Sequence, residues 1–296
     1  MSGAGAAGGC TLLRTRAELR AWRAAAPSGA ALGLVPTMGA LHAGHAALVA
    51  RARAENQRVL VSVFVNELQF NNAEDLARYP RTLDADLALC ARSGAHAIYA
   101  PAAADVYPAG FTSVVEPGPA ADLFEGAARP GHFRGVLTVV LKLLQRTQPR
   151  RAYFGEKDAQ QLFLVRKMVN DFDLDAEIVA CATVREPDGL ALSSRNRRLA
   201  AAQRPHALAL WRGLCAARAA FDAGERAPAA LAAALRGALA EAARAGAVTA
   251  DYAAVVDDRD FAPARATDPG PWRAVVAASV HGVRLIDNLA LGDARA

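Results

Sequence analysis

The first half of the chain alternates short apolar runs with longer segments in which apolar residues recur every three or four positions. Short apolar runs predict buried strands, and the longer spacing predicts amphipathic helices. The expected strands are Leu32–Val35, Val59–Val65, Ala97–Ala100, Ala152–Phe154 and Glu177–Cys181. The expected helices are Arg16–Ala25, Gly44–Asn56, Thr82–Ser93, Val136–Gln145 and Ala159–Val169. This alternation predicts an α/β fold, a Rossmann-like parallel sheet with helices on both faces.

The pattern changes after residue 183, where long helical stretches rich in alanine and arginine are followed by β-like runs. The elements expected there are Pro205–Ala223, Pro228–Ala245, Tyr252–Asp257 and Trp272–Val280. They predict a smaller C-terminal α+β domain. We therefore expect two domains, residues 1–183 and 184–296, with residues 1–10 as a disordered lead-in rich in small residues.

Composition narrows the possible environments and partners. An apolar content of 53% can fill a packed core, and no run approaches the roughly 18 apolar residues of a membrane-spanning helix. The net charge of +5 comes from basic residues spread along the chain, which argues against nucleic-acid binding. The four cysteines are too scattered to suggest a disulfide framework or a metal knuckle. We expect a cytoplasmic protein that binds neither nucleic acid nor membrane.

The segment Val35–His45 carries the most informative chemistry, because it lies where the first strand should lead into a helix. Ligands bind at this carboxyl edge of parallel sheets, and the start of a helix attracts anions. His42 and His45 could donate hydrogen bonds there to an α-phosphate on which charge builds up. A pair of histidines in a surface loop is the alternative. The strand-to-helix context and the neighbouring Gly39 and Gly44 favour the anion site.

Two further segments carry groups that suit phosphate. Ser193–Asn196 offers two hydroxyls and a guanidinium, although alone it would be an ordinary turn or helix cap. Lys157 follows an expected strand and opens an expected helix. It is one of only three lysines in a chain with abundant arginine, so its compact ammonium group is a candidate for neutralising phosphate charge. A solvated surface lysine is the alternative.

The sequence His42-Ala43-Gly44-His45 resembles the His-x-Gly-His motif of the nucleotidyltransferase superfamily. More specifically, seven segments in order resemble motifs of the pantothenate synthetase (pantoate–β-alanine ligase) family. They are Pro36–His45, Phe64–Phe70, Tyr79–Thr82, Glu125–Phe133, Gly155–Gln161, Val184–Leu190 and Ser193–Asn196. The segment Arg284–Asn288 resembles the family's C-terminal ending. The resemblance extends from about residue 31 to about residue 290.

This resemblance implies a ligase of pantothenate and coenzyme A biosynthesis. Such an enzyme condenses (R)-pantoate with β-alanine, consuming ATP and releasing AMP and pyrophosphate through a pantoyl-adenylate intermediate. ATP would be a substrate together with Mg²⁺, with no organic prosthetic group. The resemblance also implies a homodimer, whereas the metal ligands stay unknown.

The resemblance assigns roles to individual residues. The catalytic residues it implies are His42, His45, Lys157 and Arg195. Among these, His45 is the implied proton donor. The residues it implies for ATP binding are Met38, Gly39, Ala40, Leu41, His42, Ala43, Gly44, His45, Gly155, Glu156, Lys157, Asp158, Val184, Leu192, Ser193, Ser194 and Arg195. Those it implies for pantoate or β-alanine are Asn66, Gln69, Arg129, His132 and Gln161.

Three positions depart from the family pattern. Glu67 replaces the usual proline and brings a carboxylate near the expected pantoate pocket, which puts the loop geometry in question. Ala43 replaces the usual glutamate between the motif histidines. Ala85 stands where the family often has a carboxylate implicated in metal binding. Asp84 or Asp86 could take over that role, and a solvated helix face is the alternative.

Two other functions stay open at this point. One is another adenylyl- or cytidylyltransferase of the superfamily, which would leave the nucleotide on its product. The other is a regulatory nucleotide-binding protein that has lost catalysis. Gln69 and Gln161 argue against the first, and the histidine motif with Lys157 and Arg195 argues against the second.

Overall fold

The computed structural model describes residues 6–7, 9–267 and 270–292, and it divides into two compact units. Unit 1 comprises Met1–Gly118, Arg129–Glu156 and Leu164–Ala182. Unit 2 comprises Pro119–Ala128, Lys157–Phe163 and Thr183–Ala296. The second unit therefore includes two segments from the first half of the sequence. The expected domain boundary between residues 183 and 184 stays a prediction.

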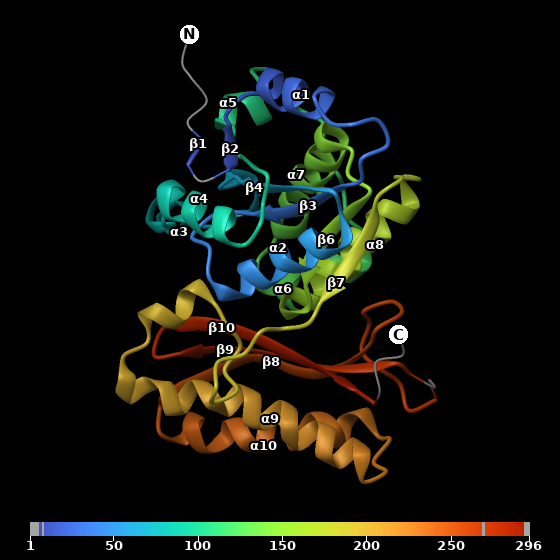
Figure 1. Cartoon of the computed structure of the whole chain (residues 1–296). Helices are drawn as coiled ribbons and strands as arrows, with labels where there is room; N and C mark the ends of the chain where they lie inside the picture. Colours follow the sequence, from blue (N-terminus) through green and yellow to red (C-terminus); the bar gives the residue numbers. More distant parts are fainter. Residues whose placement is uncertain (1–5, 8, 268–269, 293–296) are drawn as a thin grey trace. The chain divides into compact units, whose positions relative to one another are not determined.

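Unit 1 is built around a seven-stranded sheet in the order β1-β2-β5-β4-β3-β6-β7 (Figure 1). The strands are β1 Ala6–Ala7, β2 Cys10–Leu13, β3 Leu32–Thr37, β4 Arg58–Val63, β5 Ala97–Tyr99, β6 Arg151–Gly155 and β7 Glu177–Cys181. Strands β2 to β7 pair in parallel, and β1 pairs antiparallel with β2 at the edge. The Rossmann-like parallel sheet and all five expected strands are confirmed.

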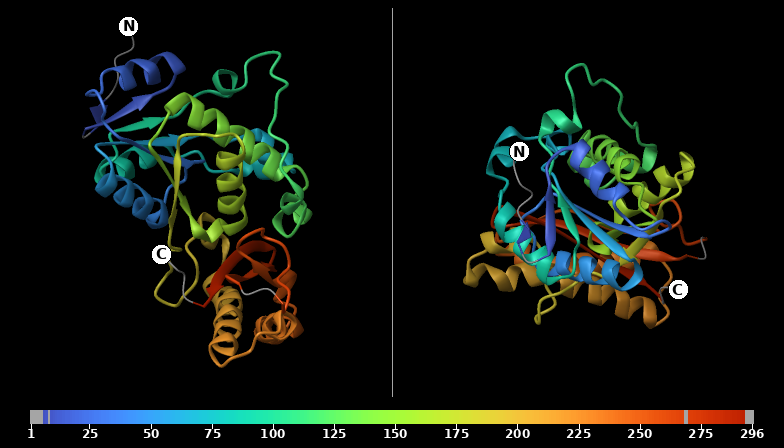
Figure 2. Two further views of the ribbon diagram at one scale, coloured as in Figure 1. Left: turned by 90° about the vertical axis from the view of Figure 1, so that its right-hand side faces the viewer. Right: turned by 45° about the horizontal axis from the view of Figure 1, so that its top comes forward.

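Helices cover both faces of this sheet, as expected. They are α1 Arg16–Ala24, α2 Ala43–Glu55, α3 Ala73–Arg78, α4 Leu83–Arg92, α5 Ala103–Val106, α7 His132–Thr147 and α8 Ala159–Asp171, with the single turn η1 at Glu67–Gln69. Val35 of β3 packs in one buried cluster with Val49 and Ala52 of α2 and Cys90 of α4. The adjacent Leu34, also fully buried, points to the opposite face, because side chains alternate along a strand. Figures 1 and 2 show α1 and α7 on that opposite side.

The N-terminal expectation needs correction. Residues 1–10 were expected to be disordered, but Ala6–Ala7 forms β1 and the fully buried Cys10 opens β2. Residues 1–5 and 8 lie outside the described residues. Strand β2 exists because it pairs with β5, with Thr11 opposite Ala97. Such a distant partner leaves no signal in the local pattern of a four-residue strand.

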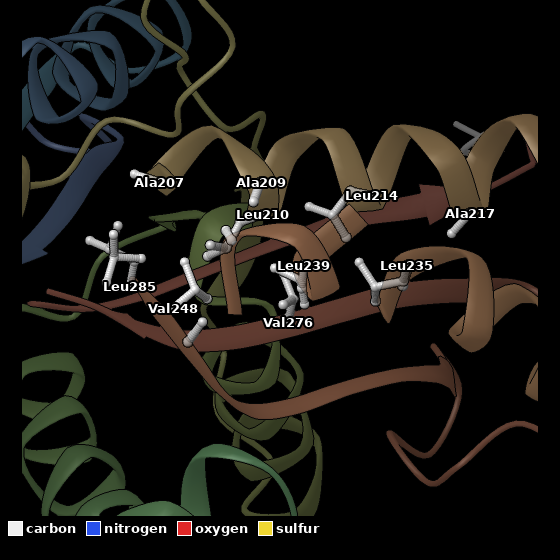
Figure 3. Packing of buried hydrophobic residues seen from close by; sticks show 14 of the residues in the cluster. Ala207, Ala209, Leu210, Leu214, Ala217, Leu235, Leu239, Val248, Val276 and Leu285 are labelled. Atoms are coloured by element: carbon white, nitrogen blue, oxygen red, sulfur yellow. The ribbon is translucent and has the colours of Figure 1, made fainter. Parts of the chain in front are cut away.

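Unit 2 contains an antiparallel sheet in the order β10-β9-β8, formed by β8 Val248–Asp257, β9 Trp272–Val280 and β10 Val283–Leu291. Helices α9 Arg204–Asp222 and α10 Pro228–Arg244 pack on it. Leu210, Leu214, Leu235 and Val276 lie in their shared apolar core (Figure 3). The two helices approach closely at Gly213, where an added Cβ would lie 2.7 Å from the carbonyl oxygen of Leu235.

The smaller elements of unit 2 include several short turns. They are η2 Pro119–Asp122, α6 Glu125–Ala128, η4 Ser194–Arg198, η5 Ala201–Gln203 and most of η3 Glu156–Asp158. The expected smaller C-terminal α+β architecture is confirmed, with β10 as an additional strand. No helix in the described part of the chain is long and apolar enough to cross a membrane.

Candidate active site

The order of the strands in unit 1 locates the candidate site. From β3 the chain proceeds through β4 to β5 on one side of the sheet, whereas β6 and β7 extend it on the other side. Ligands of such sheets bind beyond the carboxyl ends of the strands where the order reverses. These ends are Thr37 of β3 and Gly155 of β6, so the segments that follow, from Met38 and from Glu156, leave neighbouring strands at that point.

The loop after β3 is held by the buried carboxylate of Asp86. Its Oδ2 accepts a hydrogen bond from the backbone N–H of Ala40 at 3.1 Å, and its Oδ1 accepts one from Leu41 at 2.8 Å. Gly39 has a φ of +85°, and a Cβ there would lie 3.0 Å from Asp86 Oδ2. Thr82 also donates to Oδ1, at 3.2 Å. Asp86, one of the two carboxylates considered for metal binding, therefore fixes the shape of this loop.

The two motif histidines form the start of α2. His42 is the N-cap, and its Nδ1 accepts a hydrogen bond from the N–H of Gly44 at 3.2 Å. The Nδ1 of His45 accepts one from the N–H of His42 at 3.3 Å. Since each Nδ1 accepts, each neutral ring carries its proton on Nε2. The structure thus provides two Nε2–H donors, with ring centroids 4.2 Å apart, at the positive end of a helix.

Five of the residues predicted for substrate binding are joined in one hydrogen-bond network in unit 1. The buried Gln69 accepts from Asn66 Nδ2 at its Oε1 (3.0 Å) and donates from its Nε2 to Met38 Sδ (3.1 Å). The carbonyl of Gln69 lies 2.9 Å from the Nδ1 of His132 and accepts from Arg129 Nη2 at 3.3 Å. The backbone and side chain of Gln69 are both fixed by these contacts.

Asn66 is held by residues that the sequence did not single out. Its Nδ2 also donates to the carbonyl of Gly135 at 3.0 Å, and its Oδ1 accepts from the hydroxyl of Tyr107 at 2.7 Å. Gly135 permits this approach, because a Cβ there would lie 2.3 Å from the carbonyl oxygen of Leu68. Tyr107 lies outside the motifs. Its sequence offers only a hydroxyl on an aromatic ring, which does not identify a hydrogen-bond partner. The Asn66 side chain, itself held by Gly135 and Tyr107, therefore fixes the side chain of Gln69.

Glu67 leaves the loop around Gln69 intact. It begins the single turn η1, its side chain faces solvent, and Asn66 and Gln69 on either side are buried. The residue that replaces the usual proline therefore adds a carboxylate at the surface of the turn, while Gln69 points inward.

Unit 2 brings together a second group of predicted residues. One pocket of this unit is lined by Lys157, Leu190, Ala191, Ser193, Arg195, Asn196, Leu210, Leu285, Ile286 and Asp287. Ser193 caps η4 by accepting from the N–H of Arg195 at 3.2 Å. The carbonyl of Lys157 accepts from Asn288 Nδ2 at 2.9 Å. Lys157, Ser193 and Arg195 are 38 positions or less apart in sequence and contribute to the same pocket.

Asp287, which lines this pocket, belongs to a buried ion pair with Arg185. The two Arg185 amino groups donate to Asp287 at 2.6 and 3.0 Å, and the guanidinium lies 3.7 Å from the ring centroid of Trp211. The Asp287 side chain is only 3% exposed. Both residues lie in segments that carry the family resemblance, but neither was predicted as a site residue. Their pairing spans 102 positions of sequence and could not be read from spacing.

The remaining predicted residues occupy different surroundings. Gly155 and Glu156 are half-buried at the end of β6, and Asp158 is exposed. The carbonyl of Val184 accepts from the N–H of Leu192 at 3.0 Å, closing a short hairpin. The other predicted residues, Ser194 and Gln161, are half-buried in unit 2. Within residues 6–7, 9–267 and 270–292, no three or more His, Cys, Asp or Glu side chains are grouped to hold a metal ion.

Comparison with known proteins identifies the family of this chain. The family model for pantoate-beta-alanine ligase matches residues 11–290. The chain belongs to this family. A pantothenate synthetase of Nocardioides sp. is 54% identical over 289 residues, covering 95% of this chain and 85% of the relative. One from Cereibacter sphaeroides is 50% identical, covering 94% and 98%.

Solved structures agree with this membership. Pantothenate synthetase from Thermus thermophilus has 46% sequence identity and a TM-score of 0.88, covering 95% of this chain and 99% of that one. The pantoate–β-alanine ligase from Francisella tularensis, complexed with beta-gamma ATP and beta-alanine, has 33% identity and a TM-score of 0.75, covering 94% and 97%. The chain is thus an ATP-utilising ligase of pantothenate biosynthesis that joins pantoate to β-alanine. The transferase and the inactive regulator considered above are set aside.

Asp86→Ala should weaken both the fold and nucleotide binding. Three donors lose their acceptor, so we expect the free energy of unfolding to fall by about 2–3 kcal/mol. The KM for ATP should rise, because the loop that leads to His42 and His45 loses its anchor. Urea unfolding and steady-state kinetics measure the two effects. Asp84→Ala, which removes an exposed carboxylate from the same helix, is the matched control. An Asp86→Ala enzyme with unchanged KM would contradict the anchoring role.

Asp287→Ala should destabilise unit 2. The substitution leaves the guanidinium of Arg185 without its bidentate partner, and an uncompensated buried charge is costly. We expect a loss of about 3 kcal/mol, near the lower end of the range for buried pairs because Arg185 keeps its contact with Trp211. Asp287→Asn retains one acceptor and should lose less. Urea unfolding of both variants checks the prediction, and equal losses would contradict it.

Proposed function

We propose that the ligation proceeds through a pantoyl-adenylate. A carboxylate oxygen of pantoate attacks the α-phosphorus of ATP, and the bond to the departing pyrophosphate breaks. The amine of β-alanine then attacks the acyl carbon, the bond to AMP breaks, and the amine loses a proton to give pantothenate. Both displacements require positioning and charge stabilisation and no protein nucleophile. The observation that supports this chemistry is the pair of Nε2–H donors at the start of α2.

Unit 1 supplies the groups for the α-phosphate and for pantoate in this proposal. Met38–His45 binds ATP, and the Nε2–H groups of His45 and His42 donate hydrogen bonds to the phosphate. Gln69 binds the polar end of pantoate. Its support comes from a network that fixes one side-chain orientation before substrate arrives, which lowers the cost of ordering it on binding. Asn66 acts by holding Gln69.

Arg129 and His132 act on the other side of the same residue. Arg129 Nη2 donates to the Gln69 carbonyl, and the ring of His132 contacts the same oxygen. Arg129 Nη1 and His132 Nε2 also lie 3.1 Å apart. We assign both residues to the pantoate or β-alanine pocket, where they fix the Gln69 backbone.

Unit 2 supplies positive charge and further hydrogen-bond donors. Lys157 and Arg195 bind phosphate oxygens, assisted by the hydroxyls of Ser193 and Ser194, and Gln161 binds pantoate. The pocket that Lys157, Ser193 and Arg195 line within this unit supports the phosphate role. The remaining contacts to adenine and ribose are assigned to Gly155, Glu156, Asp158, Val184 and Leu192.

ATP would enter as its magnesium complex. Mg²⁺ prefers oxygen ligands and often binds through substrate phosphates with few protein groups. The described residues fit this mode, since they form no cluster of three metal-binding side chains and the oxygens of Asp86 accept from the loop after β3. Mg²⁺ would then be held through the phosphates of the nucleotide, where it would offset their charge.

We also propose a homodimer in the reducing cytoplasm. The exposed apolar side chains of Leu68 and Val114 line one hollow of unit 1, which supports burial against a second copy. All four cysteines are free thiols, and burial raises the pKa of Cys10 to about 11 and that of Cys90 to about 12. Light scattering of the purified chain should give the mass of two copies. A monomeric mass would contradict the dimer.

Isotope exchange between pyrophosphate and ATP tests the proposed intermediate. A pantoyl-adenylate forms reversibly without β-alanine, so label from pyrophosphate should enter ATP when pantoate is present and β-alanine is absent. AMP release should require all three substrates. Exchange that depended on β-alanine would overturn the two-step pathway and favour a single concerted step.

A further inference from the structure

The backbone of the proposed phosphate-binding Lys157 is anchored by a side chain from β10. The Nδ2 of Asn288 donates to the carbonyl oxygen of Lys157 at 2.9 Å, and Asn288 is only 5% exposed. Lys157 lies in the short turn η3 Glu156–Asp158. The hydrogen bond from Asn288 links this turn to the three-stranded sheet of unit 2.

The orientation of the Asn288 amide is set by Arg273. Nη1 of Arg273 donates to Asn288 Oδ1 at 2.6 Å, and a guanidinium can only donate. The oxygen of the amide must therefore face Arg273, which leaves the nitrogen facing the carbonyl of Lys157. Arg273 in turn binds Asp258 through Nε and Nη2, at 2.8 and 3.1 Å. Both partners of this ion pair are largely buried.

The backbone of Asn288 is fixed as well. Its N–H donates to Asp287 Oδ1 at 2.8 Å, and its carbonyl accepts from Arg185 Nη2 at 3.3 Å. The buried Arg185–Asp287 pair and the Asp258–Arg273 pair thus hold the same residue from its main chain and its side chain.

From this chain of contacts, we propose that Asn288 is a positioning residue for Lys157 in adenylate formation. Held by Arg273, its amide sets the turn at Lys157 and so directs the ammonium group toward the phosphates. The inference rests on the proposed function of Lys157. Small misplacements of a group that stabilises a transition state can cost about 100-fold in rate, so a side chain that never touches substrate can still limit catalysis.

Asn288→Asp removes the hydrogen bond to Lys157 and keeps the one from Arg273. Aspartate has the same shape and keeps an acceptor for Arg273, but at neutral pH its second oxygen cannot donate to the carbonyl of Lys157. We expect pantoate-dependent pyrophosphate–ATP exchange to slow about 10- to 100-fold, with the KM for pantoate changing less than threefold. The melting temperature should fall, because a buried carboxylate oxygen then faces the carbonyl of Lys157. Asn170→Asp, the same change at an exposed position, should leave exchange unaffected.

A double-mutant cycle tests whether Asn288 acts through Lys157. If it does, Asn288→Asp added to Lys157→Ala should cause little further loss of exchange, whereas independent effects would multiply. Multiplying effects, or a folded Asn288→Asp enzyme within twofold of parent activity, would overturn the inference. If Lys157→Ala itself kept full activity, the proposed role of Lys157 would fail, and with it the inference. Should Asn288→Asp not fold, Asn288→Ala removes the same donor without a buried charge and should give the same loss of exchange.

Discussion

Lys157→Ala should lower kcat about 100- to 1,000-fold in the complete reaction. Charge that builds on the phosphates as pyrophosphate leaves would lose a compact ammonium group, and an interaction made mainly in the transition state affects kcat more than KM. Lys157→Arg should recover only part of the loss, because the planar guanidinium has a different shape and donor geometry. Initial rates of pyrophosphate release at saturating substrates measure the effect.

The chain offers a matched control for this experiment. Lys167 lies on the exposed face of α8, where it forms an i,i+4 ion pair with Asp171 at 2.6 Å. Lys167→Ala removes the same side chain from the surface and should change neither kcat nor KM. A Lys157→Ala enzyme within fivefold of the parent rate would show that the lysine does not stabilise the transition state.

The local pattern of apolar residues predicted the strands in which successive residues are buried. Strands β3 and β4 are buried on both faces, so their apolar runs stand out in the sequence. The start of α2 was also predictable, because a strand, a glycine-bearing loop and a helical pattern follow one another directly. The position of His42 and His45 at the carboxyl edge of the sheet follows from these local features.

Strand β10 escaped prediction because polar residues occupy buried positions within it. Asp287 and Asn288 are 4% and 5% exposed, yet a pattern based on hydrophobicity assigns such residues to the surface. Their burial is stabilised by Arg185 and Arg273, which are distant in the sequence or on the neighbouring strand. One of these buried polar residues, Asn288, donates to the backbone carbonyl of Lys157.

The residues that hold the candidate site in place also escaped prediction, because their partners are distant in sequence. Asp86 reaches the loop after β3 across 45 and 46 positions of sequence, and Tyr107 reaches Asn66 across 41. Resemblance to a family identifies residues that its motifs contain, whereas these contacts exist only after the chain has folded. The placement of Lys157–Phe163 in unit 2 is a further example, since the segments on both sides of it, Arg129–Glu156 and Leu164–Ala182, belong to unit 1.

Replacing His45 should lower the rate about 100- to 1,000-fold, because the site loses the Nε2–H that donates to the charge building up on the α-phosphate. His45→Ala also removes the acceptor for the N–H of His42, so it mixes a chemical loss with a structural one.

Two variants with amide side chains separate the chemical loss from the structural loss. In His45→Asn, the side-chain oxygen can take the place of Nδ1 and accept from the N–H of His42, but nothing replaces the Nε2–H donor. In His45→Gln, the longer amide can place an N–H near the position of Nε2. We expect His45→Asn to melt at the parent temperature and to lose nearly as much activity as His45→Ala, while His45→Gln recovers part of it in pyrophosphate–ATP exchange. His206→Asn in α9 should leave exchange unchanged. Full activity in His45→Asn would mean that the imidazole serves only to cap α2.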